Sequence, residues 1–272
     1  MMVWAASTRC SSGSPRLYEA GGVIYRKSAD EIKVMRRAGK VVADTLDALR
    51  DALGPGVTTA ALDAVAEKVI RAAGASPSFK GYRGFPASIC ASPNHVIVHG
   101  IPSTMKLEEG DIISLDVGAF LDGYHADSAW TFPVGEVDPT ASELLKVTEA
   151  SLDAAIEQCE PGNRLGDIGF AVQQTAEPAG FSIVREYAGH GVGRALHEEP
   201  SIPNYGPAGR REVLAQGMTL AIEPMVNAGG AATKTLADGW AVVTADGSLS
   251  AHFEHTVAIT EDGHEVLTER AS

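Results

Sequence analysis

Hydrophobic residues recur at helical spacing in the first clearly patterned part of the chain. The repeating positions are Ile32, Met35, Val42, Leu46 and Leu49. Ser28 and Glu31 have the spacing of a capping box, which predicts where this helix begins, and the Gly-Pro-Gly sequence at residues 54–56 predicts its end. A second helix is predicted over about residues 59–73 and is closed by Gly74.

The order of helix, Pro-Gly, helix and Gly occurs again further along the chain. Pro139 begins a predicted helix to about residue 158, and another helix follows and ends before Gly180. Three matched pairs are each 106 residues apart: Pro55 and Pro161, Gly56 and Gly162, Gly74 and Gly180. A constant offset of this kind indicates an internal repeat, so we expect two related halves, about residues 28–135 and 136–272.

Each predicted helix pair is followed by segments typical of β-strands. Residues 112–119 and 124–132 flank an Asp-Gly turn, and residues 219–226 and 253–259 follow the second helix pair. We expect the strands of both halves to form one central sheet, with a site in the cleft between the halves. This pattern predicts an α/β (α+β) fold in a single domain over residues 21–272, preceded by a flexible extension over residues 1–20.

Composition narrows the classes of function. The 272 residues are 44% hydrophobic with mean hydropathy near zero, which suits an ordinary globular protein. A net charge of −13 argues against binding to nucleic acid, because phosphate recognition depends on clustered Lys and Arg. Cys10, Cys90 and Cys159 form no C-x-x-C pair, and we find neither a signal peptide nor a membrane span. We therefore expect a cytoplasmic protein, and a monomer because no amphipathic seam is visible.

Carboxylates and a histidine stand in strongly apolar or glycine-rich segments. Asp116 and Asp127 lie on the two strands of the predicted hairpin, His190 lies in Gly-His-Gly-Val-Gly, and Glu223 and Glu254 have apolar neighbours. A carboxylate in a hydrophobic strand is costly unless it is paired, hydrogen-bonded or bound to metal. Each of these residues alone is compatible with a turn, an edge strand or a loop. As a set, four carboxylates and an imidazole indicate two divalent ions and a hydrolytic reaction.

Two further histidines stand in turns framed by glycine and proline. His99 lies in Val-His-Gly-Ile-Pro and His197 in Leu-His-Glu-Glu-Pro. A loop histidine is often structural or solvated, but such turns fix a side chain in place. Both are candidate donors to a substrate, whereas His95, His125, His252, His255 and His264 are assigned to local hydrogen bonding or solvent.

The order of these motifs resembles that of the type I methionine aminopeptidase family. The shared motifs are His-Gly-Ile-Pro, two Asp eleven residues apart, Gly-His-Gly-Val-Gly, His-Glu-Glu-Pro, Ile-Glu-Pro-Met and Phe-Glu-His-Thr, and they span about residue 30 to the C-terminus. The resemblance implies the pita-bread fold, in which two pseudo-symmetric halves each pack a helix pair on a central curved, mainly antiparallel sheet. It also implies that Asp116, Asp127, His190, Glu223 and Glu254 bind the metals, with Asp127 and Glu254 bridging.

The same resemblance implies roles for the remaining candidates. A metal-bridging hydroxide attacks the first peptide bond, Glu223 transfers the proton, His197 stabilises the oxyanion and His99 bonds the released nitrogen. The metals anchor the substrate's amino terminus. The methionine pocket is implied to comprise Phe79, Tyr82, Phe85, Cys90, Leu196 and Trp240. Ordinary core packing is the alternative for these six residues. The chain departs from the family pattern at Phe79, Leu196 and Gly118, and Gly118 replaces a common Thr.

The resemblance also defines substrate, cofactor and rival functions. It implies removal of the initiator methionine from nascent polypeptides with a small second residue, with transient proximity to the ribosome. Residues 1–20 carry no zinc-finger or Pro-x-x-P motif for ribosome docking. The two divalent ions are cobalt, manganese, iron or zinc. A proline-specific aminopeptidase or dipeptidase is the nearest rival, although the residues before the first helix leave no room for the added domain of those enzymes. A binding protein without metals is the second rival.

Overall fold

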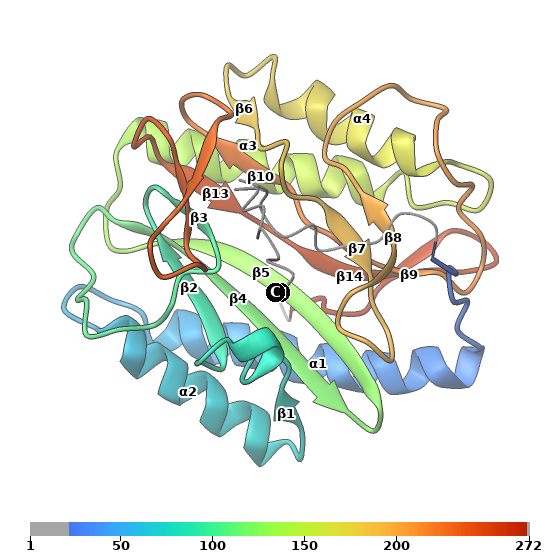
Figure 1. Cartoon of the computed structure of the whole chain (residues 1–272), viewed down its shortest axis with the longest axis horizontal. Helices are drawn as coiled ribbons and strands as arrows, with labels where there is room; N and C mark the ends of the chain where they lie inside the picture. The colour runs from blue at the N-terminus through green and yellow to red at the C-terminus, as the bar shows by residue number, and fades with distance from the viewer. Residues whose placement is uncertain (1–21, 271–272) are drawn as a thin grey trace, which may run out of the picture.

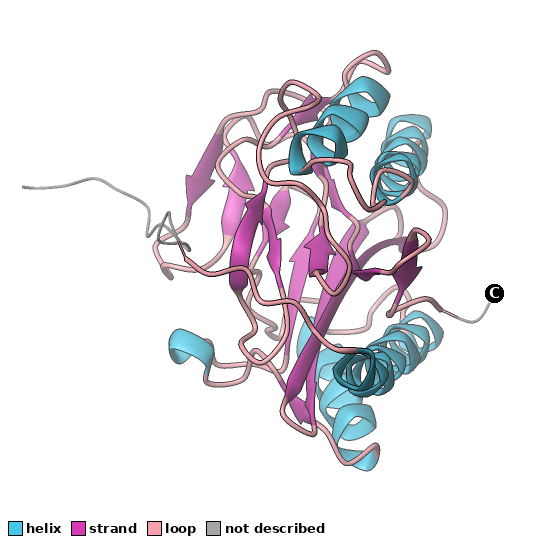
Figure 2. Cartoon of the chain, turned by 90° about the vertical axis from the view of Figure 1, so that its right-hand side faces the viewer, coloured by secondary structure: helices cyan, strands magenta, loops and turns pink. Residues whose placement is uncertain are grey.

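The strands of the protein lie between two helix pairs. The computed structural model describes residues 22–270, so the predicted extension over residues 1–20 lies outside the described residues. In Figure 1 the pair α1 and α2 lies along one side of the strands and the pair α3 and α4 along the opposite side. Figure 2 shows the same layering from a second direction, with both helix pairs on the outside.

The predicted helices are present close to their expected limits. The described residues form α1 over Ala29–Ala52, α2 over Thr59–Ala72, α3 over Pro139–Ile156 and α4 over Leu165–Ala176. Ser28 and Glu31 form the predicted capping box, in which the Ser28 side chain accepts from Glu31 N and the Glu31 carboxylate accepts from Ser28 N at 2.9 Å. Helix α1 therefore begins where its sequence satisfies its first free N–H groups.

The internal repeat is visible in the backbone as well as in the sequence. The turn between helices and the end of the second helix need a left-handed residue in each half, and glycine provides it at all four places. The φ values are +86° at Gly56, +96° at Gly162, +77° at Gly74 and +90° at Gly180. The 106-residue offset thus relates positions with the same conformational requirement.

The strands are arranged in antiparallel ladders. One four-stranded sheet has the order β1-β4-β2, with β5 paired to β4, and a five-stranded sheet has the order β15-β14-β9-β7-β8. Two smaller sheets have the orders β13-β10-β6 and β11-β12-β3. The strands of the first half are β1 Ser76–Pro77, β2 Ile89–Pro93, β3 Val96–Val98, β4 Ile112–Leu121 and β5 Tyr124–Pro133, with the 3-10 helix η1 over Tyr82–Gly84.

The second half supplies shorter strands. They are β6 Ser182–Ile183, β7 Gly189–Gly191, β8 Glu198–Ile202, β9 Thr219–Ile222, β10 Met225–Asn227, β11 Thr233–Thr235, β12 Val242–Thr244, β13 Ser250–His252, β14 His255–Ile259 and β15 His264–Val266. The predicted segment 219–226 is divided into β9 and β10 at Glu223-Pro224, where proline has no N–H to donate. In the segment 253–259, strand β14 begins only at His255. Phe253 and Glu254 separate it from β13, which ends at His252.

These breaks replace the expected single sheet by ladders that meet at a seam. At the seam, hydrogen bonds from side chains to the backbone replace some of the backbone–backbone bonds of a regular strand pair. Thr256 Oγ1 accepts from Asp127 N at 3.0 Å and donates to Asp127 O at 2.8 Å, and Ser128 Oγ donates to Glu254 O. A single backbone bond, from Glu254 N to Ala129 O at 2.8 Å, also crosses between β5 and the residues before β14. The two halves therefore join edge to edge along β5 and β14.

Each half has its own hydrophobic core. One cluster of buried residues packs α1 and α2 on β2, β4 and β5, and includes Leu46, Leu62 and Leu115. The other packs α3 and α4 on the strands of the second half, and includes Leu152, Ile168 and Phe253. Trp130 packs against both clusters. Within residues 22–270, no helix is both long and apolar enough to cross a membrane.

Candidate metal centre and adjoining pocket

The seam between the two halves carries all five candidate metal ligands. Asp116 is on β4 and Asp127 on β5, and His190 is on β7. Glu223 follows β9, and Glu254 lies between β13 and β14, at the two places where the strands break. The five side chains line one cavity, which also receives His99, His197 and the six pocket residues named from the sequence. The fold thus brings together segments spread over most of the chain.

The carboxylates of this cluster have the environment that a cation needs. Ligand atoms of Asp127, His190 and Glu254 lie within 4.8 Å of one another, and all three residues are buried. Oδ1 of Asp116, Oδ1 of Asp127 and Oε1 of Glu254 are buried without a hydrogen-bond partner among the described residues. Buried acceptors without donors are costly, and hard oxygen donors beside one imidazole suit divalent ions. The residues present therefore fit a metal.

The tautomer of His190 is set by the backbone. Its Nδ1 lies 2.9 Å from the carbonyl oxygen of Gly191, which can only accept a hydrogen bond. The ring proton is therefore on Nδ1, and the lone pair of Nε2 points toward the carboxylate cluster, 3.6 Å from Glu223 Oε1. Burial lowers the pKa of His190 to about 4, so the ring is neutral near pH 7, which is the form that binds metals.

Burial also changes the protonation of the carboxyl groups. It raises the pKa of Asp116 to about 7, although hydrogen bonds from its neighbours partly oppose the rise. Burial and the adjacent carboxylates hold the pKa values of Asp127, Glu223 and Glu254 well above their usual range. Without a cation, the cluster therefore keeps protons that ordinary carboxylates lose.

His252 was assigned to solvent or local hydrogen bonding from the sequence, and this assignment was wrong. Its side chain is buried, and its Nε2 lies 3.6 Å from Glu223 Oε2 with no hydrogen-bond partner among the described residues. The Glu223 carboxylate is thus flanked by His190 on one oxygen and His252 on the other. His252 ends β13 directly before the Phe-Glu-His-Thr motif, and this position was a local signal of its place in the site.

The two candidate donor histidines lie at the wall of the same cavity. His197 stacks on the ring of Tyr82 with its Nδ1 2.9 Å from the Tyr82 hydroxyl, and its ring centroid is 4.2 Å from that of His190. His99 has a φ of +61° and makes edge contacts with Tyr187 and Trp240. Burial lowers the pKa of His99 to about 4 and that of His197 to about 2, so both rings are neutral near pH 7.

The six residues named from the sequence as a methionine pocket lie together at the apolar end of the cavity. Phe79, Phe85, Cys90 and Leu196 form a buried cluster, against which Tyr82 and Trp240 pack. Two departures from the family pattern lie next to each other here. A Cβ atom at Gly118 would lie 2.8 Å from Cε1 of Phe79 and 2.8 Å from Cβ of Ser78. A side chain at residue 118 would therefore need Phe79 and Ser78 to shift, and glycine leaves room for both.

Five further residues line the cavity, namely Arg83, Val98, Tyr187, Ala188 and Met225. Val98 directly precedes His99 in a quoted motif, whereas Arg83 and Ala188 had no signal in the sequence. Tyr187 reaches it from the segment before β7, where no periodicity or motif marks it. Met225 had a signal, because it ends the Ile-Glu-Pro-Met motif directly after Glu223.

Comparisons with known proteins agree with this geometry. A family model described as metallopeptidase family M24 matches residues 33–261. The chain is 54% identical over 246 residues to methionine aminopeptidase 1 of Bacillus subtilis, covering 90% of this chain and 99% of that protein. The crystal structure of methionine aminopeptidase from Rickettsia prowazekii has a TM-score of 0.90 at 44% identity and covers 91% of this chain and 100% of its own.

A more distant structural likeness extends to the rival class. Prolidase from Pyrococcus furiosus has a TM-score of 0.73 at 23% identity, covering 91% of this chain and 66% of the prolidase chain. At this identity the likeness shows a shared fold alone. It does not transfer the specificity of that enzyme.

The protonation of the cluster predicts how metal removal affects stability. Above about pH 7.5 the histidines are largely neutral in both the folded and the unfolded chain, whereas the carboxyl groups with raised pKa values lose their protons at higher pH in the folded chain than in the unfolded chain. While the folded chain holds these protons the unfolded state binds fewer, and the free energy of unfolding of the metal-free protein should fall as the pH rises from about 7.5 to about 9. The slope is about 1.4 kcal/mol per pH unit for each such proton.

Urea unfolding of the chelator-treated protein at both ends of this range measures the effect. The same protein with a saturating divalent ion serves as the control, and its loss of stability over the range should be much smaller because the ion binds the charged form. Equal stability of the metal-free protein at both pH values would contradict the prediction.

Proposed function

The chain belongs to metallopeptidase family M24, and from this membership we propose that it removes the initiator methionine from polypeptides in a metal-dependent reaction. One observation carries the proposal: the carboxylate and histidine cluster and the apolar pocket open into the same cavity. An aminopeptidase needs both, one to act on the first peptide bond and one to accept the first side chain.

The proposed metal centre consists of Asp116, Asp127, His190, Glu223 and Glu254. Two divalent ions would suit a set of four carboxylates and one imidazole, and cobalt, manganese, iron and zinc are all chemically compatible with it. When bound, such ions would neutralise the clustered carboxylates and supply activated water near neutral pH. The buried acceptor atoms without partners support this assignment.

We assign proton transfer to Glu223. Its carboxylate lies at the junction of the cluster and the cavity, and the nitrogen atoms of His190 and His252 lie 3.6 Å from its two oxygens. A carboxylate at this place can accept a proton from the attacking water and deliver it to the leaving amine.

His197 and His99 are assigned to the substrate. The pKa of His197 of about 2 means that its ring has a single N–H near pH 7. If Tyr82 donates its hydroxyl proton to Nδ1, that N–H is on Nε2, where it can donate to the carbonyl oxygen as negative charge develops. His99, held in a left-handed turn, is assigned to the nitrogen of the first peptide bond.

The methionine side chain is assigned to the cluster of Phe79, Tyr82, Phe85, Cys90, Leu196 and Trp240. An aromatic and sulfur-containing wall suits a polarizable thioether. We further propose that a small second residue is preferred, that the substrates are nascent chains and that the reaction occurs in the cytoplasm. Two free cysteines, Cys90 and Cys159, support a reducing compartment.

Peptide hydrolysis tests the proposed activity. The purified protein, first treated with chelator and then supplied with manganese or cobalt, should release methionine from Met-Ala-Ser and should leave Ala-Pro-Ala intact. Met-Lys-Ser should be cleaved at least about tenfold more slowly than Met-Ala-Ser, because a long second side chain is a poor fit. Release of alanine from the proline peptide would instead assign the chain to the proline-specific branch, and metal binding without any cleavage would favour a binding protein.

The role of His197 makes a separate prediction. His197→Ala should lower kcat by on the order of 100-fold to 1,000-fold, because it removes a hydrogen bond that strengthens in the transition state. The metal content per chain should stay unchanged, since this residue is not among the assigned ligands. Elemental analysis beside steady-state kinetics measures both quantities, and a parallel loss of metal and turnover would show that His197 acts on the metal centre.

A further inference from the structure

The segment that carries His197 has little packing on one side. Residues 192–197 connect β7 to β8 and place Leu196 and His197 at the wall of the pocket. On the other side of His197 lies a second cavity of about 640 Å³, which is also lined by Lys27, Arg194 and Glu198. Backbone bonds from Val192 N to Thr219 O and from His125 N to Gly193 O hold the start of this connection, whereas Leu196 and His197 lie further along it.

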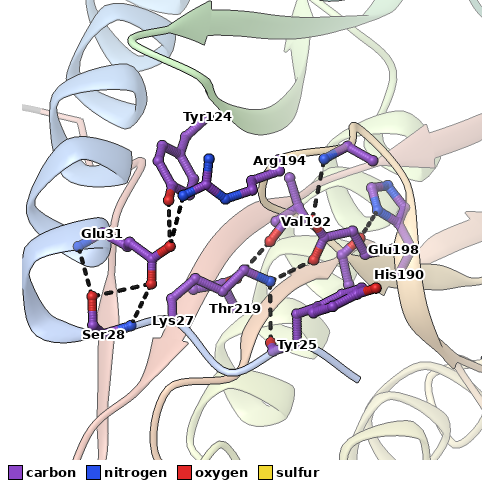
Figure 3. A network of polar contacts seen from close by, with 12 residues as sticks. Tyr25, Lys27, Ser28, Glu31, Tyr124, His190, Val192, Arg194, Glu198 and Thr219 are labelled. Carbon is purple, nitrogen blue, oxygen red and sulfur yellow. Dashed lines mark hydrogen bonds and ion pairs between the residues drawn. The ribbon is translucent and has the colours of Figure 1, made fainter. Parts of the chain in front are cut away.

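A buried ion pair lies beneath the connection. The Lys27 ammonium donates to Glu198 Oε2 at 2.5 Å and to the carbonyl oxygen of Tyr25 at 3.2 Å (Figure 3). The side chains are only 5% and 7% exposed, so solvent screens their attraction little. By contrast, the neighbouring ion pair of Arg194 with Glu31 includes an arginine side chain that is 70% exposed, and such pairs contribute little.

The Lys27–Glu198 ion pair connects the segment of residues 192–197 to the residues before β9. On the lysine side, the backbone N–H of Lys27 donates to Gly217 O at 2.6 Å, directly before β9. On the other side, Glu198 Oε1 accepts from Ala195 N at 3.1 Å, which closes the turn around Leu196 and His197. The turn is packed so tightly on the pair that a Cβ atom at Gly193 would overlap Lys27 and lie 2.7 Å from Glu198 Oε1.

We propose that Lys27, through Glu198, is the positioning residue for His197. The role rests on the proposed function, because it is defined by the effect of His197 on turnover. Lys27 does not line the cavity of the metal centre, so it acts through the turn and not on the substrate. Loss of its ammonium leaves the Glu198 carboxylate without its ion-pair partner, so the side chain turns toward the adjoining second cavity. This movement breaks the bond to Ala195 N and allows His197 to leave the stacking position on Tyr82.

A double-mutant cycle on kcat tests this role. Lys27→Met keeps the length of the side chain and should lower kcat on the order of tenfold, because a small displacement of a transition-state donor is costly. In the His197→Ala background the same change should lower kcat less than about twofold, since the positioned group is already gone. Lys27→Arg, which restores a cation, should recover much of the activity.

Lys33→Met is the matched control, because Lys33 lies near the start of α1 with a side chain that is 66% exposed and paired only with Asp30. It should leave kcat unchanged in both backgrounds. If Lys27→Met fails to fold, the double variant Lys27→Met with Glu198→Gln takes its place in the cycle. This variant removes both charges and keeps a side-chain oxygen that can accept from Ala195 N. Equal loss of kcat from Lys27→Met with and without His197, or no loss, would overturn the proposal.

Limited proteolysis provides a readout that does not depend on activity. Trypsin cleaves after Arg194, which lies within the turn, and Lys27→Met should speed this cleavage severalfold under native conditions. Lys33→Met loses one trypsin site as well, so it corrects for the change in site number. A wild-type protein that releases no methionine would speak against the proposed function, whereas an unchanged rate of cleavage at Arg194 in Lys27→Met would speak against the positioning role.

Discussion

The carboxyl groups of Asp116, Asp127, Glu223 and Glu254 lie together in a seam that excludes most water, and the rest of the site depends on this crowding. Like charges at such distances in an apolar setting are not stable as four free anions. The raised pKa values describe one way to relieve the repulsion, which is to keep protons. Divalent cations relieve the same repulsion by neutralising the carboxylates, and they can also activate a water molecule for hydrolysis.

The repeat explains why the crowding occurs between two halves and not within one. Each half has its own helix pair and large hydrophobic core, and the halves meet along β5 and β14 and through the pairing of β3 with β12. Between β5 and β14 regular strand pairing gives way to bonds made by Thr256 and Ser128. Polar side chains are therefore already part of the junction, and the ligands Asp127 and Glu254 lie beside them.

Local features of the sequence predicted much of this structure. The capping box at Ser28, the Asp-Gly hairpin at residues 122–123 and the 106-residue offset each depend on neighbouring residues or on repetition, which a single sequence displays. The division of the antiparallel strands into several ladders was not predicted, because the pairing of distant strands depends on how the two halves meet. His252 was misassigned because its partner Glu223 is distant in the sequence.

Other relationships exist only in three dimensions. The close approach of Gly118 to the ring of Phe79 joins β4 to the loop after β1, and the bond from Lys27 to Glu198 crosses 171 positions of the chain. In the sequence, Phe79 and Gly118 were separate departures from a family pattern, and Lys27 was an unremarked cation before a helix. Periodicity identifies which residues are buried, but it does not identify the partner that makes their burial tolerable.

In the metal-free protein the carboxyl cluster holds protons, and divalent cations replace them on binding. Calorimetric titration of the metal-free protein with manganese at about pH 7, repeated in two buffers of different ionisation enthalpy, counts the protons released on binding. We expect a net release of about one proton or more per protein chain, because Asp127, Glu223 and Glu254 have pKa values above their usual range. Binding heats that are independent of the buffer would mean that no proton is displaced, and they would contradict the exchange of protons for cations.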